Sequence, residues 1–423
     1  MNAEIISIGD ELLIGQITNT NSVWIAQQLT LLGIRVIHHS SIADSESAIV
    51  NAFDQALKRS SSFVFITGGL GPTKDDITKR CFADYFQSKL VMNEEVLAIV
   101  TSFFVKRGRE VTELNRQQAL VPEHCEVIMN YKGTAPGMWM QKQNTIFISM
   151  PGVPHEMKAM MSDSVLPAIT KRFSLPAIFH KSVLTVGMGE SMLAEKIENW
   201  ENALEPDGIR LAYLPQPGMV RLRLSAFGGD QKTLQDKVEK HIKSLRALIP
   251  ENIFATESFG EEHLSLQEVV LDLLRERQMS FSVAESCTGG YLSSLITAVP
   301  GASDVFKGGI VPYTNGAKRD LLGLDENIFQ NFGAVSKECV TELARNARLK
   351  FNSDFGIGIS GIAGPSGGTA EKPVGLVWIA VAGKDKLIAM KYQFGENRQI
   401  NITMSAITAL NMLRKLILKN TQT

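Results

Sequence analysis

The sequence predicts two α/β domains with mainly parallel sheets, joined by a small α+β domain. Toward both ends of the chain, short apolar segments alternate with longer stretches of helical period. In the middle, one segment alternates apolar and polar residues, as a half-exposed antiparallel strand does. The length of 423 residues suffices for two to four domains of about 100–200 residues each. We expect boundaries at residues 1–170, 171–256 and 257–423.

The first domain opens with a βαβαβ rhythm. Its expected strands and helices alternate along the chain: 4–8, 21–32, 35–38, 47–57 and 63–67. This rhythm predicts a parallel sheet with helices on both faces. Because ligands bind at the carboxyl ends of the strands in such sheets, the segments after Ile8 and Thr67 are candidate sites.

The middle domain has a different texture. Strands are expected at 182–186 and 220–227, and helices at 190–200 and 234–248. The polar stretch 257–263 is expected to be a linker.

The last domain again mixes buried strands with helices. Its expected strands are 281–284, 308–312, 355–360 and 376–381, and its expected helices are 265–278, 291–298, 337–351 and 398–419.

Composition excludes several classes of protein. With 43 basic and 44 acidic side chains the net charge is −1, which gives no basic excess for general nucleic-acid binding. The longest apolar run, 375–383, is far below the ~18 residues of a bilayer span, and we expect the first residues to form a strand and not a signal peptide. Four scattered cysteines fit neither disulfides nor structural zinc. We expect a cytoplasmic protein that binds neither membrane nor nucleic acid.

Glycines and carboxylates follow two strands of the first domain, in Gly9-Asp10-Glu11 and in the string 67–78. Glycine-rich backbone before a helix offers amide groups to an anion, and the adjacent Asp75 and Asp76 suit a divalent cation. The alternative is that these residues only cap a helix and form a turn. The string matches neither GxxxxGK[ST] nor GxGxxG.

A rigid turn, Pro151-Gly-Val-Pro154, follows the expected strand 145–149 and brings Glu156 toward the same strand ends. No second histidine stands at ligand spacing from His155, so we do not expect a histidine metal site.

These motifs, together with Asn19-Thr-Asn21 and Gly133-Thr-Ala-Pro-Gly137, resemble the molybdopterin-binding fold as it occurs in the CinA family. The resemblance implies hydrolysis of ADP-ribose at its pyrophosphate with a divalent metal of the Mg, Mn or Co class. It implies substrate binding by Asp10, Asn21, Gly68, Gly69, Gly71 and Thr73, and metal binding by Asp75, Asp76 and Glu156. Leu70 replaces the Thr common in molybdenum-cofactor enzymes, which disfavours molybdopterin as the ligand.

The string Ala284-Glu-Ser-Cys-Thr-Gly-Gly290 lies between an expected strand and helix. Ser286, Cys287 and Thr288 are three possible nucleophiles at a helix start, where free N–H groups stabilise an oxyanion. Lys318 serves as a general base if burial lowers its pKa. The alternatives are a helix cap, a buried thiol and a solvated lysine.

This string, with Tyr-Thr-Asn at 313–315, Ile359-Ser-Gly-Ile-Ala-Gly-Pro365 and Glu371-Lys-Pro-Val-Gly375, resembles the nicotinamide mononucleotide deamidase domain at the carboxyl end of CinA proteins. The resemblance implies hydrolysis of a carboxamide without a cofactor. It implies catalytic roles for Ser286 or Thr288 as nucleophile, Lys318 as base and Tyr313 as an orienting group. It implies substrate binding by Gly289, Gly290, Ser360, Gly361 and Arg398, the last through the 5′-phosphate.

The middle segment is similar to the KH-like domain of full-length CinA proteins. KH domains bind nucleic acid through a GXXG loop, and Gly187-Met-Gly189 and Gly228-Gly229 do not form one. The resemblance to the CinA family implies nicotinamide mononucleotide and ADP-ribose as ligands, and it implies a homodimer, which is also the commonest closed assembly. The alternative is that only the deamidase is active and the first domain is a regulatory module for a nucleotide or a pterin.

Overall fold

A computed structural model describes residues 1–73, 76–261 and 264–419. By its internal contacts the chain forms two compact units, residues 1–179 with 227–234 and residues 180–226 with 235–423. Most of the predicted middle domain, residues 180–226 and 235–256, therefore lies in one unit with the predicted last domain, while residues 171–179 and 227–234 belong to the first unit. No described helix has the length and apolar character needed to cross a membrane.

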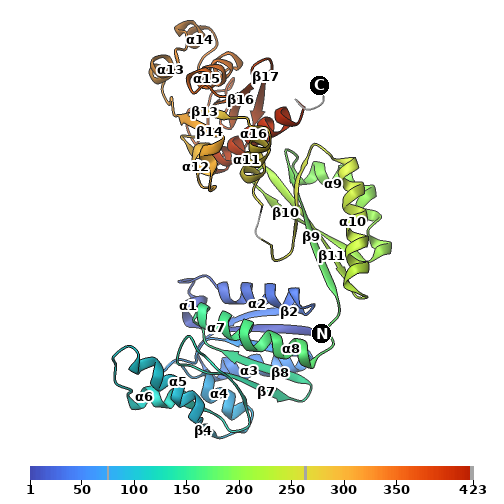
Figure 1. The fold of residues 1–423 in the computed structure, drawn as a ribbon, viewed down its shortest axis with the longest axis vertical. Helices are drawn as coiled ribbons and strands as arrows, with labels where there is room; N and C mark the ends of the chain where they lie inside the picture. Colours follow the sequence, from blue (N-terminus) through green and yellow to red (C-terminus); the bar gives the residue numbers. More distant parts are fainter. Residues whose placement is uncertain (74–75, 262–263, 420–423) are drawn as a thin grey trace. The chain divides into compact units, whose positions relative to one another are not determined.

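The first unit is built on a six-stranded sheet of order β2-β1-β3-β8-β7-β6 (Figure 1). Its strands are β1 Asn2–Ile8, β2 Arg35–Ile42, β3 Phe63–Thr67, β6 Glu126–Ile128, β7 Gly137–Lys142 and β8 Thr145–Met150. A small pair is formed by β4 Leu90–Met92 and β5 Leu120–Pro122. The strands β2, β1, β3 and β8 run parallel to one another. Strand β7 pairs antiparallel with both of its neighbours, β8 and β6.

Helices cover both faces of this sheet because β3 is buried on both sides. Phe63 and Phe65 face one cluster with α2 and α7, and Val64 and Ile66 face another with α3 and α4. The helices of this unit are α1 Asp10–Leu13, α2 Thr20–Leu31, α3 Glu46–Lys58, α4 Thr78–Tyr85, α5 Glu94–Val105, α6 Glu113–Arg116, α7 Pro154–Met160 and α8 Leu166–Arg172.

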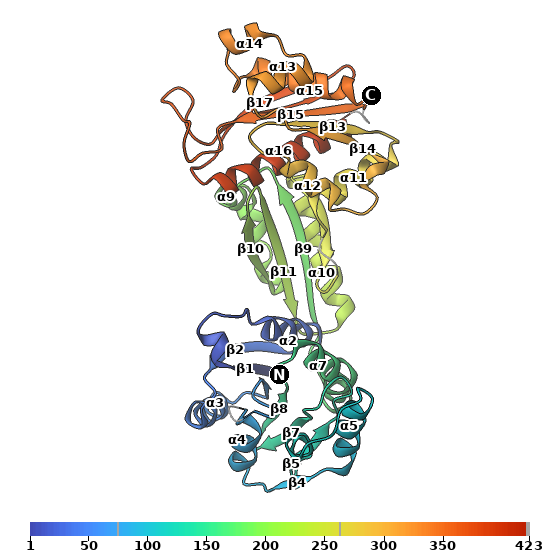
Figure 2. The same cartoon turned by 90° about the vertical axis from the view of Figure 1, so that its left-hand side faces the viewer.

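The second unit begins with a four-stranded sheet of order β10-β11-β9-β12, in which β10 pairs antiparallel with β11 and β9 with β12. The strands are β9 Ile178–Val186, β10 Ile209–Gln216, β11 Met219–Phe227 and β12 Ile253–Ser258. Helices α9 Glu190–Asn202 and α10 Gln231–Leu248 lie on one face of it (Figures 1 and 2). The predicted linker 257–263 is wrong at its start, because Glu257 and Ser258 complete β12.

A five-stranded sheet of order β14-β13-β15-β16-β17 carries the rest of the second unit. Its strands are β13 Phe281–Glu285, β14 Phe306–Ile310, β15 Phe355–Gly361, β16 Leu376–Ala382 and β17 Leu387–Gln393. Its helices are α11 Leu266–Glu276, α12 Tyr291–Thr297, α13 Asn315–Leu322, α14 Glu326–Asn331, α15 Lys337–Lys350 and α16 Arg398–Lys419. The strands β14, β13 and β15 run parallel to one another. Strand β16 pairs antiparallel with both of its neighbours, β15 and β17.

Strand β15 shows why helices pack on both faces of this sheet. Ile357 and Ile359 are fully buried in the core with α11 and α16. On the opposite face, a Cβ at Gly356 would lie 2.0 Å from the carbonyl oxygen of Ala344 in α15. Glycine is thus required for α15 to approach the strand this closely.

Candidate active sites

The three parallel strands of the second unit end at one edge of the five-stranded sheet. Register pairs Ala284 of β13 with Ile310 of β14 and with Gly358 of β15. The loops that follow these strands therefore meet at this edge, as expected for a ligand site in an α/β sheet.

Ser286 and Lys318 are in direct contact at this edge. The amide of Ser286 donates to the carbonyl of Ile359 at 3.0 Å, which ties the loop after β13 to β15. Thr314 caps α13 by accepting from the amide of Ala317, and one turn later Lys318 Nζ lies 3.1 Å from Ser286 Oγ. Lys318 is only 2% exposed. The structure thus brings the predicted base to one of the predicted nucleophiles.

Burial sets the protonation of the neighbouring groups. Desolvation lowers the pKa of Lys318, against smaller raising effects of Cys339 and Cys287, because a buried ammonium loses its hydration. Lys318 forms no ion pair with any described carboxylate. Burial also raises the pKa of Cys287 to about 12, so this thiol stays protonated and is a poor nucleophile.

The turn after Ser286 presents polar groups to the same place. The amide of Gly289 is occupied, since it donates to the carbonyl of Ser286 at 3.1 Å. The hydroxyl of Thr288 is buried and has no hydrogen-bond partner among the described residues. The amide of Gly290 likewise donates to no described group. Unpaired buried polar groups such as the Thr288 hydroxyl are rare, and this hydroxyl and the partly exposed Gly290 amide are available to a ligand.

Tyr313 and Arg398 extend this cluster outward. Tyr313 accepts from Lys318 Nζ through its backbone carbonyl at 3.4 Å, and its ring hydroxyl accepts from Arg398 at 3.1 Å. Arg398, at the start of α16, also donates to the carbonyl of Gly364 at 2.8 Å. Ser360 is buried and its hydroxyl donates to Ala334 at 2.6 Å, and Gly361 lies against β16. Ser360 therefore has a structural hydrogen bond in addition to its predicted role.

In the first unit, the loops after β1, β3 and β8 surround a cavity of about 550 Å³. Gly68 has φ 113°, and a Cβ there would lie 2.1 Å from the carbonyl oxygen of Ile8. Only glycine fits such a conformation and such an approach. Gly68, Gly69, Gly71, Asp76 and Glu156 line the cavity, as do Glu11 and Asp44.

Asn21 ties two of these loops together. Its amide nitrogen donates to Thr67 at 3.1 Å and to the carbonyl of Gly152 at 2.7 Å, while its amide oxygen has no partner among the described residues. Thr73 is bound to Asp76, whose carboxylate accepts from the amide of Thr73 at 3.0 Å. Of the predicted binding residues here, Asp10 is exposed and binds Asp44: each accepts from the amide of the other.

The carboxylates around this cavity suit a hard divalent cation in chemistry. Burial raises the pKa of Asp44; the hydrogen bond from the Asp10 amide opposes this rise, and the negative charges of Asp10, Glu11 and Asp76 add smaller contributions to it. Glu156 accepts from Asn130 at 2.6 Å. Within the described ranges, however, no three His, Cys, Asp or Glu side chains group as a ligand set, and the predicted ligand Asp75 lies outside those ranges. We therefore assign no coordination geometry.

Family models match nearly the whole chain. A probable molybdopterin binding domain matches residues 4–171, a damage-inducible protein CinA KH domain residues 180–255, and a CinA C-terminal domain residues 263–417. A CinA-like protein of Cytophaga hutchinsonii is 44% identical over 413 residues, covering 98% of this chain and 97% of that protein. The chain belongs to the CinA family. Both the resemblance and the fold class predicted from the sequence are confirmed.

Other CinA proteins show the same similarity. A CinA-like protein of Flavobacterium psychrophilum is 45% identical over 421 residues, with 99% of each protein covered. Among solved structures, a competence/damage inducible protein from Agrobacterium tumefaciens is 37% identical and covers 36% of this chain and 93% of its own, with a TM-score of 0.35.

The sequence analysis assigned no role to four residues of this CinA protein that lie at or near the candidate sites. Asp44 follows β2, a parallel neighbour of β1, so its place at the sheet edge could have been predicted from strand order. Glu285 is fully buried and accepts from the amides of Leu292 and Ser293. Lys79 donates to the carbonyl of Gln118 at 2.8 Å, and burial lowers its pKa to about 8. The fourth, Glu11, lies in the quoted motif but was given no role.

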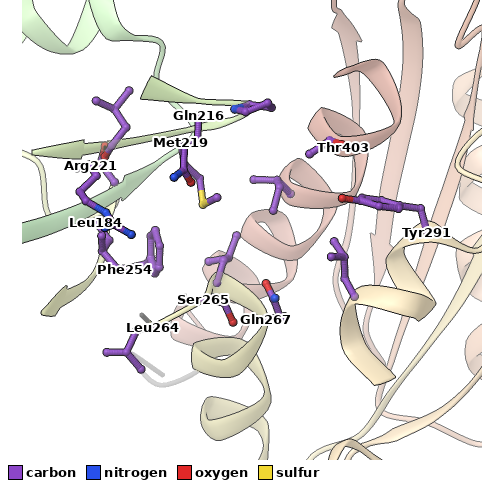
Figure 3. A pocket seen from close by; sticks show the side chains of 16 residues that line it. Leu184, Gln216, Met219, Arg221, Phe254, Leu264, Ser265, Gln267, Tyr291 and Thr403 are labelled. Carbon is purple, nitrogen blue, oxygen red and sulfur yellow. Dashed lines mark hydrogen bonds between the residues drawn. The ribbon is translucent and has the colours of Figure 1, made fainter. Parts of the chain in front are cut away.

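A further cavity of about 420 Å³ lies between the four-stranded sheet and helices α11, α12 and α16 (Figure 3). Its lining is mostly apolar, with Leu184, Met219 and Phe254 on the sheet side. Tyr291, the first residue of α12, also lines it. Neither Ser286 nor Lys318 does, so this cavity is separate from the candidate amidase site.

Proposed function

We propose that the carboxyl-terminal domain hydrolyses the carboxamide of nicotinamide mononucleotide to nicotinate mononucleotide and ammonia. The contact between Ser286 Oγ and Lys318 Nζ, at 3.1 Å, carries this proposal. A lysine with a lowered pKa beside a serine hydroxyl is an arrangement that activates a nucleophile. We choose Ser286 over Thr288 as the nucleophile because this contact involves Ser286.

The proposed reaction proceeds through an acyl-enzyme. Neutral Lys318 accepts the hydroxyl proton while Ser286 Oγ attacks the carboxamide carbon. Lys318 then returns the proton to the amide nitrogen, the carbon–nitrogen bond breaks, and ammonia leaves. Water attacks the resulting ester and gives a proton to Lys318, which passes it to Ser286 Oγ as the acid product departs. The Gly290 amide and the Thr288 hydroxyl face the developing oxyanion.

The test is ammonia release from nicotinamide mononucleotide in excess EDTA. We expect wild-type activity to persist with chelator, because no step of this mechanism uses a metal ion. Ser286→Ala should lower kcat by several orders of magnitude, since removing a nucleophile disables the whole unit. Ser294→Ala, an exposed position in α12, is the matched control and should keep full activity. Loss of activity in EDTA, or full activity of Ser286→Ala, would contradict the mechanism.

We also propose that the first domain hydrolyses ADP-ribose to AMP and ribose 5-phosphate with a divalent metal. The glycine-lined cavity of about 550 Å³ with its carboxylates supports this second function. Asp76 and Glu156 would hold the metal, with Asp75 as the third ligand suggested by the sequence. A bound metal would stabilise charge on the phosphoryl oxygens.

The test is AMP release from ADP-ribose with Mg²⁺ or Mn²⁺. We expect EDTA to abolish it and Asp76→Asn to remove it even with metal. Asp163→Asn, exposed in the first unit, is the control. Binding of ADP-ribose without turnover would favour the alternative in which this domain is a regulatory module, and an unchanged rate in Asp76→Asn would refute the metal site.

A further inference from the structure

The first unit has a second, chemically different cavity. Its volume is about 660 Å³, and it lies between α5 and the turn at 131–132. The polar and aromatic side chains that line it are Glu95, Phe103, Lys106, Arg107, Tyr131 and Lys132.

This cavity is positively charged in a chain whose net charge is −1. Lys106, Arg107 and Lys132 contribute three cations against the single carboxylate of Glu95. In the described part of the chain none of the three cations forms an ion pair, and the Arg107 side chain donates a hydrogen bond to the carbonyl of Phe103 at 3.4 Å. Like charges that converge without counterions attract an anionic ligand.

Flat groups accompany the charges. The guanidinium carbon of Arg107 lies 3.5 Å from the centre of the Phe103 ring, so the guanidinium plane has one face on the ring. Tyr131 is 70% exposed, which leaves most of its side chain accessible to a ligand. Aromatic rings and arginine planes stack on nucleobases.

One turn forms a wall of both cavities of this unit. Asn130 is buried, and its side-chain oxygen accepts from the amides of Lys132 and Gly133 at 3.0 and 2.9 Å. Its amide nitrogen donates to Glu156 at 2.6 Å, and Glu156 with Thr134 lines the glycine-rich cavity. The Asn130 side chain thus links the turn that carries Lys132 to Glu156 in the glycine-rich cavity.

We propose that the cavity between α5 and Tyr131 binds the nucleoside 5′-phosphate end of the nucleotide that occupies the glycine-rich cavity. The base stacks on Tyr131, and the phosphate binds Lys132 and Lys106. This assignment rests on the proposed ADP-ribose hydrolysis for the identity of the ligand, but it makes a separate statement about where the nucleoside end lies.

The experiment is calorimetric titration of the full chain with AMP in EDTA, where no hydrolysis can occur. We expect Lys132→Ala to weaken AMP binding about tenfold or more, because a charge-assisted contact is lost, and Tyr131→Ala to weaken it about fivefold or more. Lys171→Ala, exposed on α8, is the control and should bind AMP as the wild type does. Both varied side chains are exposed, so their loss should leave thermal unfolding unchanged.

Ribose 5-phosphate is the second probe, because it has the phosphate without the base. It should bind the wild type more weakly than AMP, and Tyr131→Ala should remove most of this difference. Absence of AMP binding, or binding within twofold of wild type in both variants, would overturn the assignment. If AMP binding depends on Tyr131 and Lys132 but ADP-ribose is not hydrolysed, the proposed hydrolysis fails and the subsite stands.

Discussion

At the scale of single residues, Lys318 combines a cost in stability with a use in chemistry. An ammonium group that is 2% exposed and has no described carboxylate partner is poorly solvated. The protein lowers this cost by favouring the neutral amine, which is the form that a general base needs. The same burial thus destabilises the fold and prepares the site.

This conflict predicts opposite effects of Lys318→Met on activity and stability. Removing the base should lower kcat for the amidase by about 10²–10⁴-fold. The pKa of Lys318 is lowered by burial, so between that pKa and the unfolded value of 10.5 the unfolded chain binds more protons, and wild-type stability rises with pH. Lys318→Met lacks this penalty and should be more stable than wild type at pH 7, with the difference shrinking toward pH 10.

Denaturant unfolding at pH 7 and pH 10, with ammonia release at each pH, measures both effects. Lys337→Met changes an exposed lysine and should alter neither. Wild-type kcat/KM should rise with pH up to the lowered pKa. If Lys318→Met is less stable than wild type at pH 7, burial of the Lys318 ammonium does not destabilise the fold.

At the scale of elements, the junction between β13 and α12 fixes the candidate nucleophile. Glu285 ends β13, and its carboxylate accepts from the amides of Leu292 and Ser293 at 2.9 and 2.8 Å and from the Ser293 hydroxyl at 2.7 Å. The amides in the first turn of a helix have no acceptor within the helix itself, and a negative charge near the start of a helix is favourable. The loop that carries Ser286 is therefore anchored at both ends.

We predict that Glu285→Ala destabilises the protein by about 1–3 kcal/mol, because buried helix amides lose their acceptor. It should also lower kcat more than it raises KM, since Ser286 loses its position relative to Lys318. Glu276→Ala, at the exposed end of α11, is the control. Urea unfolding and steady-state ammonia release measure the two effects. Equal stability of Glu285→Ala and wild type would contradict the anchoring role.

Elements with a clear apolar pattern could be predicted from the sequence, among them parts of the edge strands β2 and β14, whereas the edge strands β10 and β17 could not. The strand 63–67 and the helix 398–419 were predicted with the bounds that the structure has. Strands β10 and β17 were missed because they lie at sheet edges with many exposed residues, so their sequences lack regular alternation. Asp44 was missed because its contribution depends on the pairing of β2 with β1.

The contact of Ser286 with Lys318 could be anticipated because each follows a strand of one predicted parallel sheet. The roles of Gly289 and Glu285 could not. Whether a particular amide in a glycine-rich turn is free depends on the local turn geometry, and nothing in a glycine pair indicates which N–H is already bonded. A glutamate beside a serine likewise reads as a catalytic partner as easily as a helix anchor.

At the scale of the whole molecule, the near-zero net charge conceals strong local contrasts. In the first unit, a cavity lined by four carboxylates shares the 130–135 turn with one that holds three cations. In the second unit, a lysine and an arginine serve a site without any described acidic partner. We therefore expect the proposed anionic ligands to bind through local groups, and no general affinity for polyanions follows.

In the second unit, hydrogen bonds from helix α16 help to join the four-stranded and five-stranded sheets into one compact body. Arg414 of α16 is 3% exposed. It donates to the carbonyls of Glu251 and Ile253, next to β12, and to Asn411 at 3.1 Å. Nearby, Lys415 pairs with the Glu251 carboxylate at 3.1 Å, but both of these side chains are more exposed.

We predict that Arg414→Leu lowers the unfolding free energy of the second unit by about 1–3 kcal/mol, because the buried carbonyl of Ile253 and the partly buried carbonyl of Glu251 lose their donor. Lys415→Ala removes a surface pair and should cost at most ~1 kcal/mol, which makes it the matched control from the same helix turn. Hydrogen exchange should show β12 exchanging faster in Arg414→Leu while the six-stranded sheet of the first unit is unaffected. Because Arg414 does not line the Ser286 site, ammonia release at low temperature should stay near wild type. Equal stability of the two variants would mean that Arg414 does not hold the sheets together, and that apolar packing around α16 alone does so.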